Sequence, residues 1–368
     1  MRSLANMVEK MGDEIDFKIV THDRDFLENE PYQKIVLNEW NSVGKAQVYY
    51  ASPGNMKLKS WQKIIKKTPH DILYLNSFFD FNFTIKLLIL RKMGKLPAKA
   101  VILAPRGEFS RGALSIKKWK KKLYIYLANM FGIYDNVIWQ ASSEYEANDI
   151  KNVTNQKGNV KIAPNLPEKV IVQKEIIEEN SSKSGIFRII FLSRISPKKN
   201  IDFALKILSK IKDPLIFDVY GIIDDERYWD YCCFLIKNLP ENISVHYKGE
   251  VVHSEVVPLM ANYDLFLFPT RGENYGHVIL EALSAGLPVL ISDQTPWKNL
   301  QEKGVGWDLS LQNKDEFVRI IKEEINMHLS KRLAKRLLAR DYATKIQNDT
   351  EVVAQNRKLF LNTIKASY

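Results

Sequence analysis

The stretch Leu265–Val289 reads LFLFPTRGENYGHVILEALSAGLPV and changes its pattern twice. Its first four apolar residues predict a buried strand, Leu265–Phe268, which a polar turn follows. A helix is then expected over Gly276–Ala285, because a glycine and a proline directly after it are typical of a helix end. A second strand is expected at Pro288–Ile291. A strand, a helix and a further strand in this order form the unit from which parallel α/β sheets are built.

The same alternation runs through most of the chain. The amphipathic stretches Trp61–Lys67, Phe83–Met93 and Lys117–Tyr134 predict helices. The expected strands are Phe17–Thr21, Ala46–Ala51, Ile72–Leu75 and Ala100–Ala104 in the first half, and Arg188–Leu192, Leu215–Tyr220, Ile243–Tyr247, Leu265–Phe268 and Pro288–Ile291 in the second. We therefore predict the α/β class with two doubly wound domains in tandem.

The domain boundary is expected after the break at Pro164–Pro167, with the polar segment Glu175–Gly185 as a loop. A chain of 368 residues exceeds what one core usually organises, which also favours two domains. A long polar helix is expected over Lys314–Ala366, broken near Asp341–Ala343. The predicted domains are residues 1–168 and 169–345, and a C-terminal helix, 346–368, is expected to pack back on the first domain.

The net charge of +11 is unevenly distributed. Twelve basic residues lie between Lys86 and Lys122, against the single acid Glu108. This block predicts an anionic partner, such as phosphate groups, a lipid surface or nucleic acid, although a solvated surface is the simpler explanation. No apolar run approaches the ~18–20 residues of a membrane helix, and the first residues lack the apolar core of a signal peptide. The adjacent Cys232 and Cys233 form no disulfide framework. We expect a cytoplasmic protein that can attach peripherally to the membrane.

Two loops beyond the carboxyl ends of strands carry the candidate chemistry, because ligands of open parallel sheets bind at that edge. Arg194, Lys198 and Lys199 bring three cations to the loop after the first strand of the second domain, which suits a diphosphate. A lysine-rich surface turn is the alternative. Glu273 lies in the second loop and can accept hydrogen bonds from sugar hydroxyls, whereas Glu281 has apolar neighbours within the helix and therefore needs a partner. Both glutamates could instead be ordinary surface charges.

These residues resemble a known family. The E-x7-E spacing of Glu273 and Glu281, the Asn-Tyr-Gly turn and the run EALSAGLPV resemble the donor site of the retaining glycosyltransferases of family four, which have the GT-B fold. The loop FLSRISPKKNID is similar to that family's Arg-x4-Lys phosphate clamp, with Arg194 and Lys199 in the two positions. The stretches Ala104–Lys122, Ala141–Ala147 and Asn165–Pro167 resemble one bacterial branch, so the likeness covers nearly the whole chain.

The resemblance implies a hexosyltransferase-type enzyme that moves a sugar from a nucleotide-diphosphate sugar to a glycan or lipid-linked acceptor with retention of configuration. Cell-surface polysaccharide biosynthesis, of lipopolysaccharide or capsule, is the implied setting. Glu273 would bind the donor sugar and Glu281 the ribose, and no cofactor or metal ion is expected because cations and a helix terminus can stabilise the diphosphate. The implied catalytic set is Glu273, Arg194 and Lys199, and the implied substrate-binding set is Glu281, Asn274, Tyr275, Gly276, His277, Arg106 and Gly107.

The chain departs from the family at two places. Many relatives carry a histidine near the position where this sequence has Pro105-Arg106-Gly107. The family's first strand and its glycine-rich turn also have no counterpart before the expected helix in MRSLANMVEKMGDE. The resemblance therefore implies a first sheet without one central strand, an acceptor site short of one wall, or a start codon placed too late.

Other functions have weaker support in the sequence. Asp23-x-Asp25 has the spacing of a metal-binding DxD motif, but such triplets are common, and the histidines show no metal-binding spacing. The aromatic residues of the basic block argue against a nucleic-acid binder, since Trp119, Tyr124 and Tyr126 have the spacing of the apolar side of an amphipathic helix. A GT-B sugar-nucleotide epimerase is the third possibility, and the E-x7-E turn argues against it.

Overall fold

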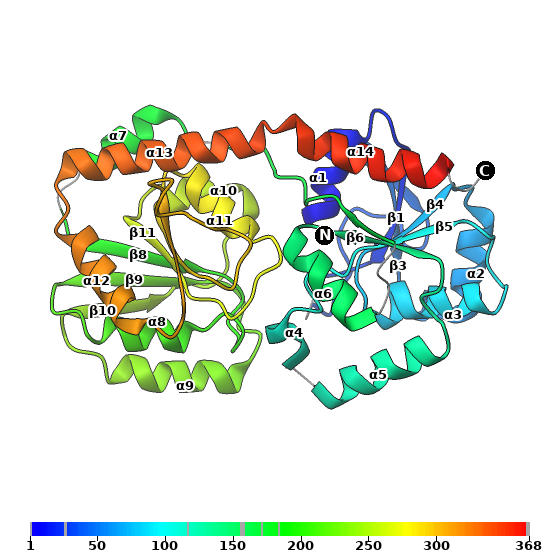
Figure 1. Cartoon of the computed structure of the whole chain (residues 1–368), viewed down its shortest axis with the longest axis horizontal. Coiled ribbons are helices and arrows are strands. Elements are labelled where there is room, and N and C mark those ends of the chain that lie inside the picture. Colours follow the sequence, from blue (N-terminus) through cyan, green and yellow to red (C-terminus); the bar gives the residue numbers. More distant parts are fainter. Residues whose placement is uncertain are drawn as a thin grey trace. The chain divides into compact units, whose positions relative to one another are not determined.

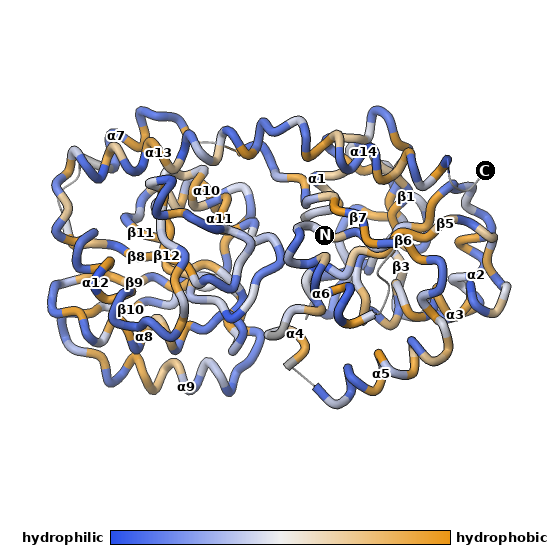
Figure 2. Tube along the Cα trace, in the orientation of Figure 1, coloured by the Kyte–Doolittle hydropathy of each residue, from blue (hydrophilic) through white to orange (hydrophobic). Residues whose placement is uncertain are grey.

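The computed structural model describes residues 2–25, 28–115, 118–154, 159–170, 172–182 and 185–365. They form two compact units (Figure 1). The first unit contains the chain up to Leu166 and again from Thr350, and the second contains Pro167–Asp349. Both units combine helices with parallel strands, which confirms the predicted two-domain α/β fold class. Figure 2 shows hydrophobic residues concentrated along the strands of each unit.

The second unit contains a six-stranded parallel sheet in the order β10-β9-β8-β11-β12-β13. Every residue of β11 and β12 is buried, which explains why these strands are continuous apolar runs rather than alternating ones. The strands are β8 (Phe187–Leu192), β9 (Leu215–Tyr220), β10 (Ile243–Tyr247), β11 (Leu265–Phe268), β12 (Val289–Ser292) and β13 (Gly306–Leu309).

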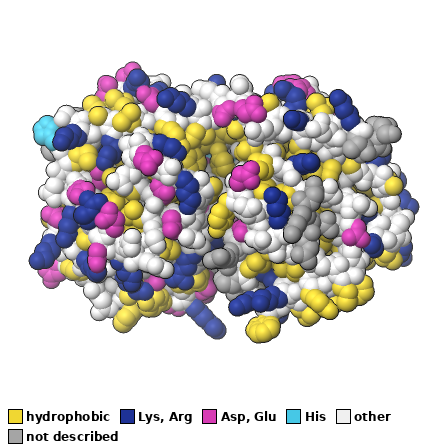
Figure 3. Space-filling view, viewed as in Figure 1, with side chains coloured by type: hydrophobic (Ala, Val, Ile, Leu, Met, Phe, Trp, Pro, Cys, Tyr) yellow, Lys and Arg dark blue, Asp and Glu magenta, His cyan; other side chains and the backbone are white. Residues whose placement is uncertain are grey.

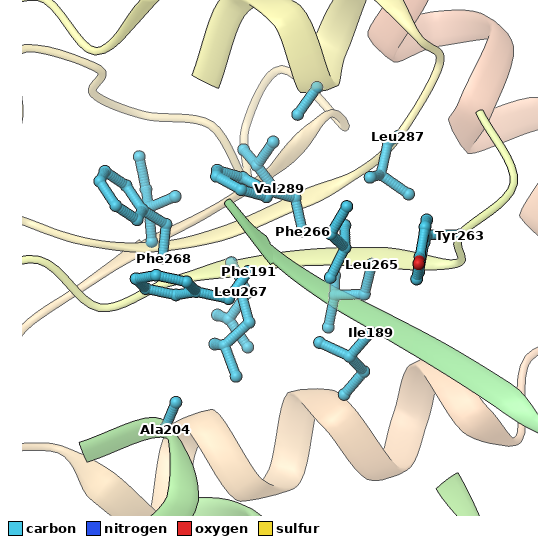
Figure 4. Packing of buried hydrophobic residues seen from close by; sticks show 14 of the residues in the cluster. Ile189, Phe191, Ala204, Tyr263, Leu265, Phe266, Leu267, Phe268, Leu287 and Val289 are labelled. Atoms are coloured by element: carbon cyan, nitrogen blue, oxygen red, sulfur yellow. The ribbon is translucent and has the colours of Figure 1, made fainter. Parts of the chain in front are cut away.

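Helices cover both faces of this sheet (Figure 1). The group α8, α9 and α12 lies on one face, and α7, α10, α11 and α13 lie on the other. Figure 4 shows how the aromatic residues of the central strands fill the core, with the rings of Phe191 and Phe268 5.8 Å apart. The helices are α7 (Lys174–Ser182), α8 (Ile201–Leu208), α9 (Glu226–Lys237), α10 (His253–Met260), α11 (His277–Ser284), α12 (Lys314–Ile325) and α13 (Leu329–Gln347).

The first unit contains two sheets, β1-β3-β2 and β4-β5-β6-β7, in which only β2 runs antiparallel to its neighbour. Within the described ranges, no strand pairs with both β1 and β4. The elements are α1 (Arg2–Met11), β1 (Phe17–His22), β2 (Trp40–Val43), β3 (Ala46–Ala51), η1 (Pro53–Asn55), α2 (Leu58–Lys67), β4 (Ile72–Leu75), η2 (Phe81–Ile85), α3 (Lys86–Lys92), β5 (Ala100–Leu103), α4 (Arg111–Ser115), α5 (Lys118–Met130), β6 (Val137–Ala141), α6 (Glu144–Thr154), β7 (Val160–Ile162) and α14 (Thr350–Lys365).

Strand β5 separates the core of the first unit into two layers because its side chains alternate between the faces of the sheet. Ile102 packs with residues of α1 and α14, whereas Val101 and Leu103 pack with residues of α2, α3 and α6. The last helix, α14, is anchored by the buried Asn356, which donates from Nδ2 to the carbonyl oxygen of Pro164 at 2.8 Å. The C-terminal segment is thus an integral part of the first unit.

Some predicted elements were wrong in their bounds. Glu175–Gly185 was expected to be a loop, but Lys174–Ser182 form α7, because the fully buried Ile177 anchors an otherwise polar helix to the core. The long C-terminal helix is three helices, with breaks between Ile325 and Leu329 and between Gln347 and Thr350 rather than near Asp341. The expected break falls inside α13, where the buried Ala343 packs into the core. Across the described residues, no helix has both the length and the apolar character to span a bilayer.

A buried carboxylate links three strands of the second sheet. Asp218 of β9 accepts hydrogen bonds from the Tyr263 hydroxyl at 2.7 Å and from the Arg188 guanidinium at 3.1 Å, and His246 Nδ1 lies 2.9 Å from its other oxygen. Burial raises the pKa of Asp218, but these hydrogen bonds outweigh it and hold the pKa below its ordinary value. The ionised form of Asp218 therefore stabilises the folded unit.

We expect Asp218→Asn to lower the free energy of unfolding by about 2 kcal/mol at neutral pH, since charged hydrogen bonds are lost. The folded-state pKa is depressed, so the stabilisation is present above the unfolded-state value and is lost as the pH falls through the folded-state pKa. Urea unfolding of both proteins from about pH 7 to about pH 3 should show the difference shrinking with acid. Asp315→Asn is the control, because its exposed pair with Lys210 should contribute little. A difference that does not depend on pH would contradict this prediction.

Candidate functional site

Two loops meet at one edge of the second sheet, as the sequence predicts. Strands β8 and β11 are parallel neighbours, so the loops after them leave the sheet side by side. The Arg271 amide donates to the Lys198 carbonyl at 2.8 Å, and Asn200 Nδ2 donates to the Pro269 carbonyl at 2.8 Å. The two loops therefore form one connected surface at the carboxyl end of the strands.

An ion pair joins the two loops at the centre of this surface. Lys199 Nζ lies 2.5 Å from Glu273 Oε2, and both side chains are more than four-fifths buried. Burial raises the pKa of the Glu273 carboxyl, but the charge and hydrogen bond of Lys199, with a further contribution from Lys198, hold the pKa below its ordinary value. Glu273 is therefore an ionised hydrogen-bond acceptor and a poor proton acceptor at neutral pH.

Arg194 lies in the same loop but has a different contact. Its guanidinium donates to Asp224 Oδ2 at 3.2 Å, and its side chain is largely exposed. Gly221, after β9, has a φ of +129°, and a Cβ there would lie 2.0 Å from the Ser193 carbonyl oxygen. A glycine is needed at this position because the loop after β9 approaches the loop after β8 so closely. The structure therefore brings Lys199 to Glu273 and places Arg194 beside the loop after β9.

The turn before α11 is shaped by Gly276, which has a φ of +75° and provides no side chain to cap the helix. The neighbouring rings of Tyr275 and His277 lie 4.7 Å apart, and Trp297 Nε1 donates to the Tyr275 carbonyl at 2.5 Å. The Asn274 amide donates to Glu273 Oε1 at 3.3 Å. The five residues predicted to hold the donor sugar and its phosphates thus form one continuous turn at the start of a helix, where the helix dipole favours anions.

Glu281 lies in the second turn of α11, between the buried residues Leu280 and Ala282. Its Oε2 atom is shielded from solvent, although the residue as a whole is only half-buried. This setting agrees with the expected apolar surroundings. The binding of a ribose by Glu281 stays a prediction.

Two residues of this site were not predicted from the sequence, Asn200 and Thr270. Asn200 has a left-handed conformation with a φ of +66°, and its side chain accepts a hydrogen bond from Arg271 Nε at 3.0 Å. Thr270 Oγ1 donates to the first loop at the Lys198 carbonyl, 3.2 Å away. Asparagine between a lysine pair and an apolar helix is a recognisable signal for such a conformation, because asparagine tolerates positive φ better than most residues. The hydrogen-bond partners, about 70 positions away, have no local signal.

In the first unit, the predicted residue Arg106 is held within a polar network. Its guanidinium donates to Asn76 Oδ1 at 2.7 Å, to the Tyr74 hydroxyl at 2.7 Å and to Asn165 Oδ1. The next residue, Gly107, donates its amide to the buried Glu146 at 2.5 Å. Arg106 therefore joins loops after β4, β5 and β7, and its expected contact with a substrate stays a prediction.

Three other acids have structural contacts. The sole acid of the basic block, Glu108, accepts hydrogen bonds from Ser77 Oγ and the Phe79 amide at 2.8 and 3.0 Å, and burial raises its pKa. In the DxD triplet, Asp23 is bound by Arg24 Nε at 2.8 Å, and Asp25 accepts from the Tyr32 hydroxyl at 2.6 Å. In the part of the chain that the structure describes, no group of three or more His, Cys, Asp or Glu could hold a metal ion.

The sequence of the second unit matches a known family. Residues 172–338 match the family model of the glycosyl transferases group 1. An uncharacterised 41.2 kDa protein in the cps region of Klebsiella pneumoniae is 28% identical over 236 residues, which are 63% of this chain and 62% of that protein. The chain thus spans less than two thirds of this relative's length.

Solved structures share the fold at low sequence identity. Sucrose-phosphate synthase from Thermosynechococcus elongatus has a TM-score of 0.76 at 13% identity, covering 99% of this chain and 93% of its own. WaaG, a glycosyltransferase involved in lipopolysaccharide biosynthesis, has a TM-score of 0.65 at 14% identity, with 97% and 95% covered. Anabaena HepE in complex with UDP-glucose has a TM-score of 0.64 at 17% identity, with 86% and 85% covered. The chain has the two-domain GT-B fold, and its match to the glycosyl transferases group 1 lies within the second unit.

Replacing Gly276 should disturb the site through its backbone. A Cβ there would lie 2.8 Å from Ile279 Cδ1 and 3.2 Å from Glu273 Cγ, in addition to the cost of a positive φ. We expect Gly276→Ala to lower stability by more than the ~1 kcal/mol of a left-handed residue. Gly249→Ala is the matched control, because its φ is +73° and its Cβ would meet nothing within 4 Å. Thermal unfolding of both variants measures the difference, and equal losses would contradict the crowding at Gly276.

Proposed function

We propose that this protein is a glycosyltransferase that moves a sugar from a nucleotide-diphosphate sugar to a glycan or lipid-linked acceptor in cell-surface polysaccharide biosynthesis. The observation that carries the proposal is the Lys199–Glu273 pair at the carboxyl edge of the second sheet. It combines a cation for a diphosphate with an ionised acceptor for sugar hydroxyls. The group 1 glycosyltransferase match covers the same residues.

The donor diphosphate is the leaving group of the reaction, and negative charge grows on it as the bond to the sugar breaks. Lys199 and Arg194 stabilise that charge, and the start of α11 adds its dipole. Lys199 is held at 2.5 Å by Glu273 before the donor binds, so little reorganisation is needed when the diphosphate enters. The site stabilises the departing group more than the intact donor, which is the requirement for catalysis.

The sugar is bound by Glu273, whose low pKa keeps the carboxylate ionised and able to accept from two hydroxyls. Glu281, which belongs to α11, accepts hydrogen bonds from the hydroxyls of the ribose. We propose that the nucleotide of the donor is UDP, because HepE, which shares the fold, is described in complex with UDP-glucose. The setting in polysaccharide biosynthesis is supported by the relative in a cps region and by the described role of WaaG.

We further propose that the anomeric configuration is retained. The acceptor hydroxyl attacks the anomeric carbon from the face that the diphosphate leaves, and its proton passes to the departing phosphate oxygen. The bond to that oxygen breaks while the new glycosidic bond forms. This route suits a site in which Glu273 is too weak a base to deprotonate the acceptor.

Lys199→Ala and Glu273→Ala should each lower kcat/KM by at least about 100-fold, since a positioned electrostatic contact to the reacting group is lost. The measurement is sugar release and transfer from a panel of UDP-sugars, and circular dichroism checks that the fold is intact. Lys210→Ala is the matched control, because this exposed lysine pairs with Asp315 and neither residue belongs to the two site loops. Full activity of either site variant would overturn the assignment.

The stereochemistry should be visible in the product. We expect proton NMR of a freshly formed product to show the same anomeric configuration as the donor. Omitting the acceptor separates transfer from other reactions of the donor, since a sugar-nucleotide epimerase would convert the donor without any acceptor. An inverted anomer would rule out the proposed route while leaving the donor site itself in place.

A further inference from the structure

Helix α5 presents an apolar face to solvent. Trp119 is 83% exposed and Tyr126 is 66% exposed, which is unusual for such large aromatic side chains. They belong to a stripe at helical spacing, and the exposed Phe131 follows directly after the helix. We call this set the α5 stripe, and it consists of Trp119, Leu123, Tyr126, Leu127 and Met130.

The opposite face of α5 attaches the helix to the first unit. Ala128 is buried there, and the Tyr124 ring lies 5.6 Å from the ring of Phe78. Lys121 also belongs to this inner face, where its Nζ donates to the Ala113 carbonyl at 2.7 Å and lies 4.9 Å from the ring centre of Phe79. The expectation that Trp119, Tyr124 and Tyr126 share one side was therefore wrong, because α5 has two apolar faces and only the one with Tyr124 is used for packing.

Lysines flank the α5 stripe on both sides. Lys118 and Lys122 are one helical turn apart on one flank, and Lys120 lies on the other. All three are exposed, and the sequence KWKKKLYIYLANM contains no acid. Figure 3 shows hydrophobic and basic side chains together at the lower edge of the view, where Figure 1 draws α5. A central apolar band with cationic flanks is the pattern of a helix that lies in a membrane interface.

We propose that the α5 stripe docks this protein on the surface of an anionic lipid bilayer. The helix lies parallel to the membrane, with Leu123 and Met130 among the acyl chains. Trp119 and Tyr126 lie at the headgroup level, which their amphipathic rings prefer. The flanking lysines extend to the lipid phosphates. This proposal does not depend on the proposed function, because it needs neither a donor nor an acceptor.

Other partners fit the α5 stripe less well. A second copy of the chain would bring two sets of lysines together, with no acid in either helix to compensate them. Single-stranded nucleic acid would stack on Trp119 and Tyr126, but Leu123, Leu127 and Met130 between them offer no stacking surface. An anionic bilayer satisfies both the charge and the aliphatic residues.

Vesicle flotation of the full chain tests the proposal. We expect binding to vesicles of phosphatidylcholine mixed with phosphatidylglycerol and much weaker binding to phosphatidylcholine alone. Changing Lys118, Lys120 and Lys122 to glutamine should weaken binding on the order of 100-fold, at about fivefold for each lysine. The matched control changes Lys59, Lys63 and Lys67 of α2 to glutamine, which removes the same charge from another exposed helix face and should have a far smaller effect.

The apolar contribution needs its own variants. Trp119→Ser with Tyr126→Ser should abolish flotation while leaving thermal unfolding unchanged, since both side chains are exposed. Phe234→Ser is the control, because this phenylalanine of α9 is also exposed. Brominated lipids should quench the tryptophan fluorescence of the wild type, and Trp119→Phe should remove most of that quenching.

Several results would overturn the proposal. Equal binding to neutral and anionic vesicles, or unchanged quenching in Trp119→Phe, would exclude docking through α5. A change of oligomeric state in the Trp119→Ser, Tyr126→Ser variant without lipid, measured by sedimentation velocity, would identify a subunit interface instead. Salt-dependent binding of single-stranded DNA with no vesicle binding would identify a nucleic-acid surface.

Discussion

The candidate site depends on the pairing of β8 with β11 in the interior of the second sheet. Leu265 and Phe266 are in register with Ile189 and Ile190, and all four side chains are buried. A shift of one residue would turn these side chains to the opposite faces, so the apolar core fixes the register. The register in turn places the two loops side by side and brings Lys199 to Glu273, which is 74 positions away in sequence. The ion pair is thus a consequence of strand order.

The same dependence explains what could be predicted from the sequence. The neighbouring strands β11 and β12 are almost entirely apolar, so their positions were clear, and the motif around Glu273 identified the loop beside them. The helix α7 was not predicted, because its sequence is polar apart from Ile177 and its neighbour. The α13 helix contains the fully buried Arg336, which donates to the Gly286 and Ala261 carbonyls. Such a residue has the sequence pattern of a surface position, and only its distant acceptors explain its burial.

In the first unit, helices were easier to predict than the faces they bury. The pattern of α5 is helical throughout, but both of its faces carry large apolar residues, so hydrophobicity alone does not show which face packs inward. Arg106 presents the same problem for polar residues. Its sequence position after β5 predicts a ligand contact, but nothing in the sequence shows that its guanidinium joins Asn76 and Asn165 from two other loops. Such networks depend on loop positions that have no local pattern.

The return of the chain to the first unit at Thr350 has a consequence for biosynthesis. The second unit is continuous in sequence, so all of its strands and helices have been synthesised before α14 is made. The first unit needs Leu359 and Phe360 of α14 to cover the layer around Ile102. We therefore expect the second unit to reach its native state first, while the first unit, although synthesised earlier, waits for the last helix with part of its core exposed.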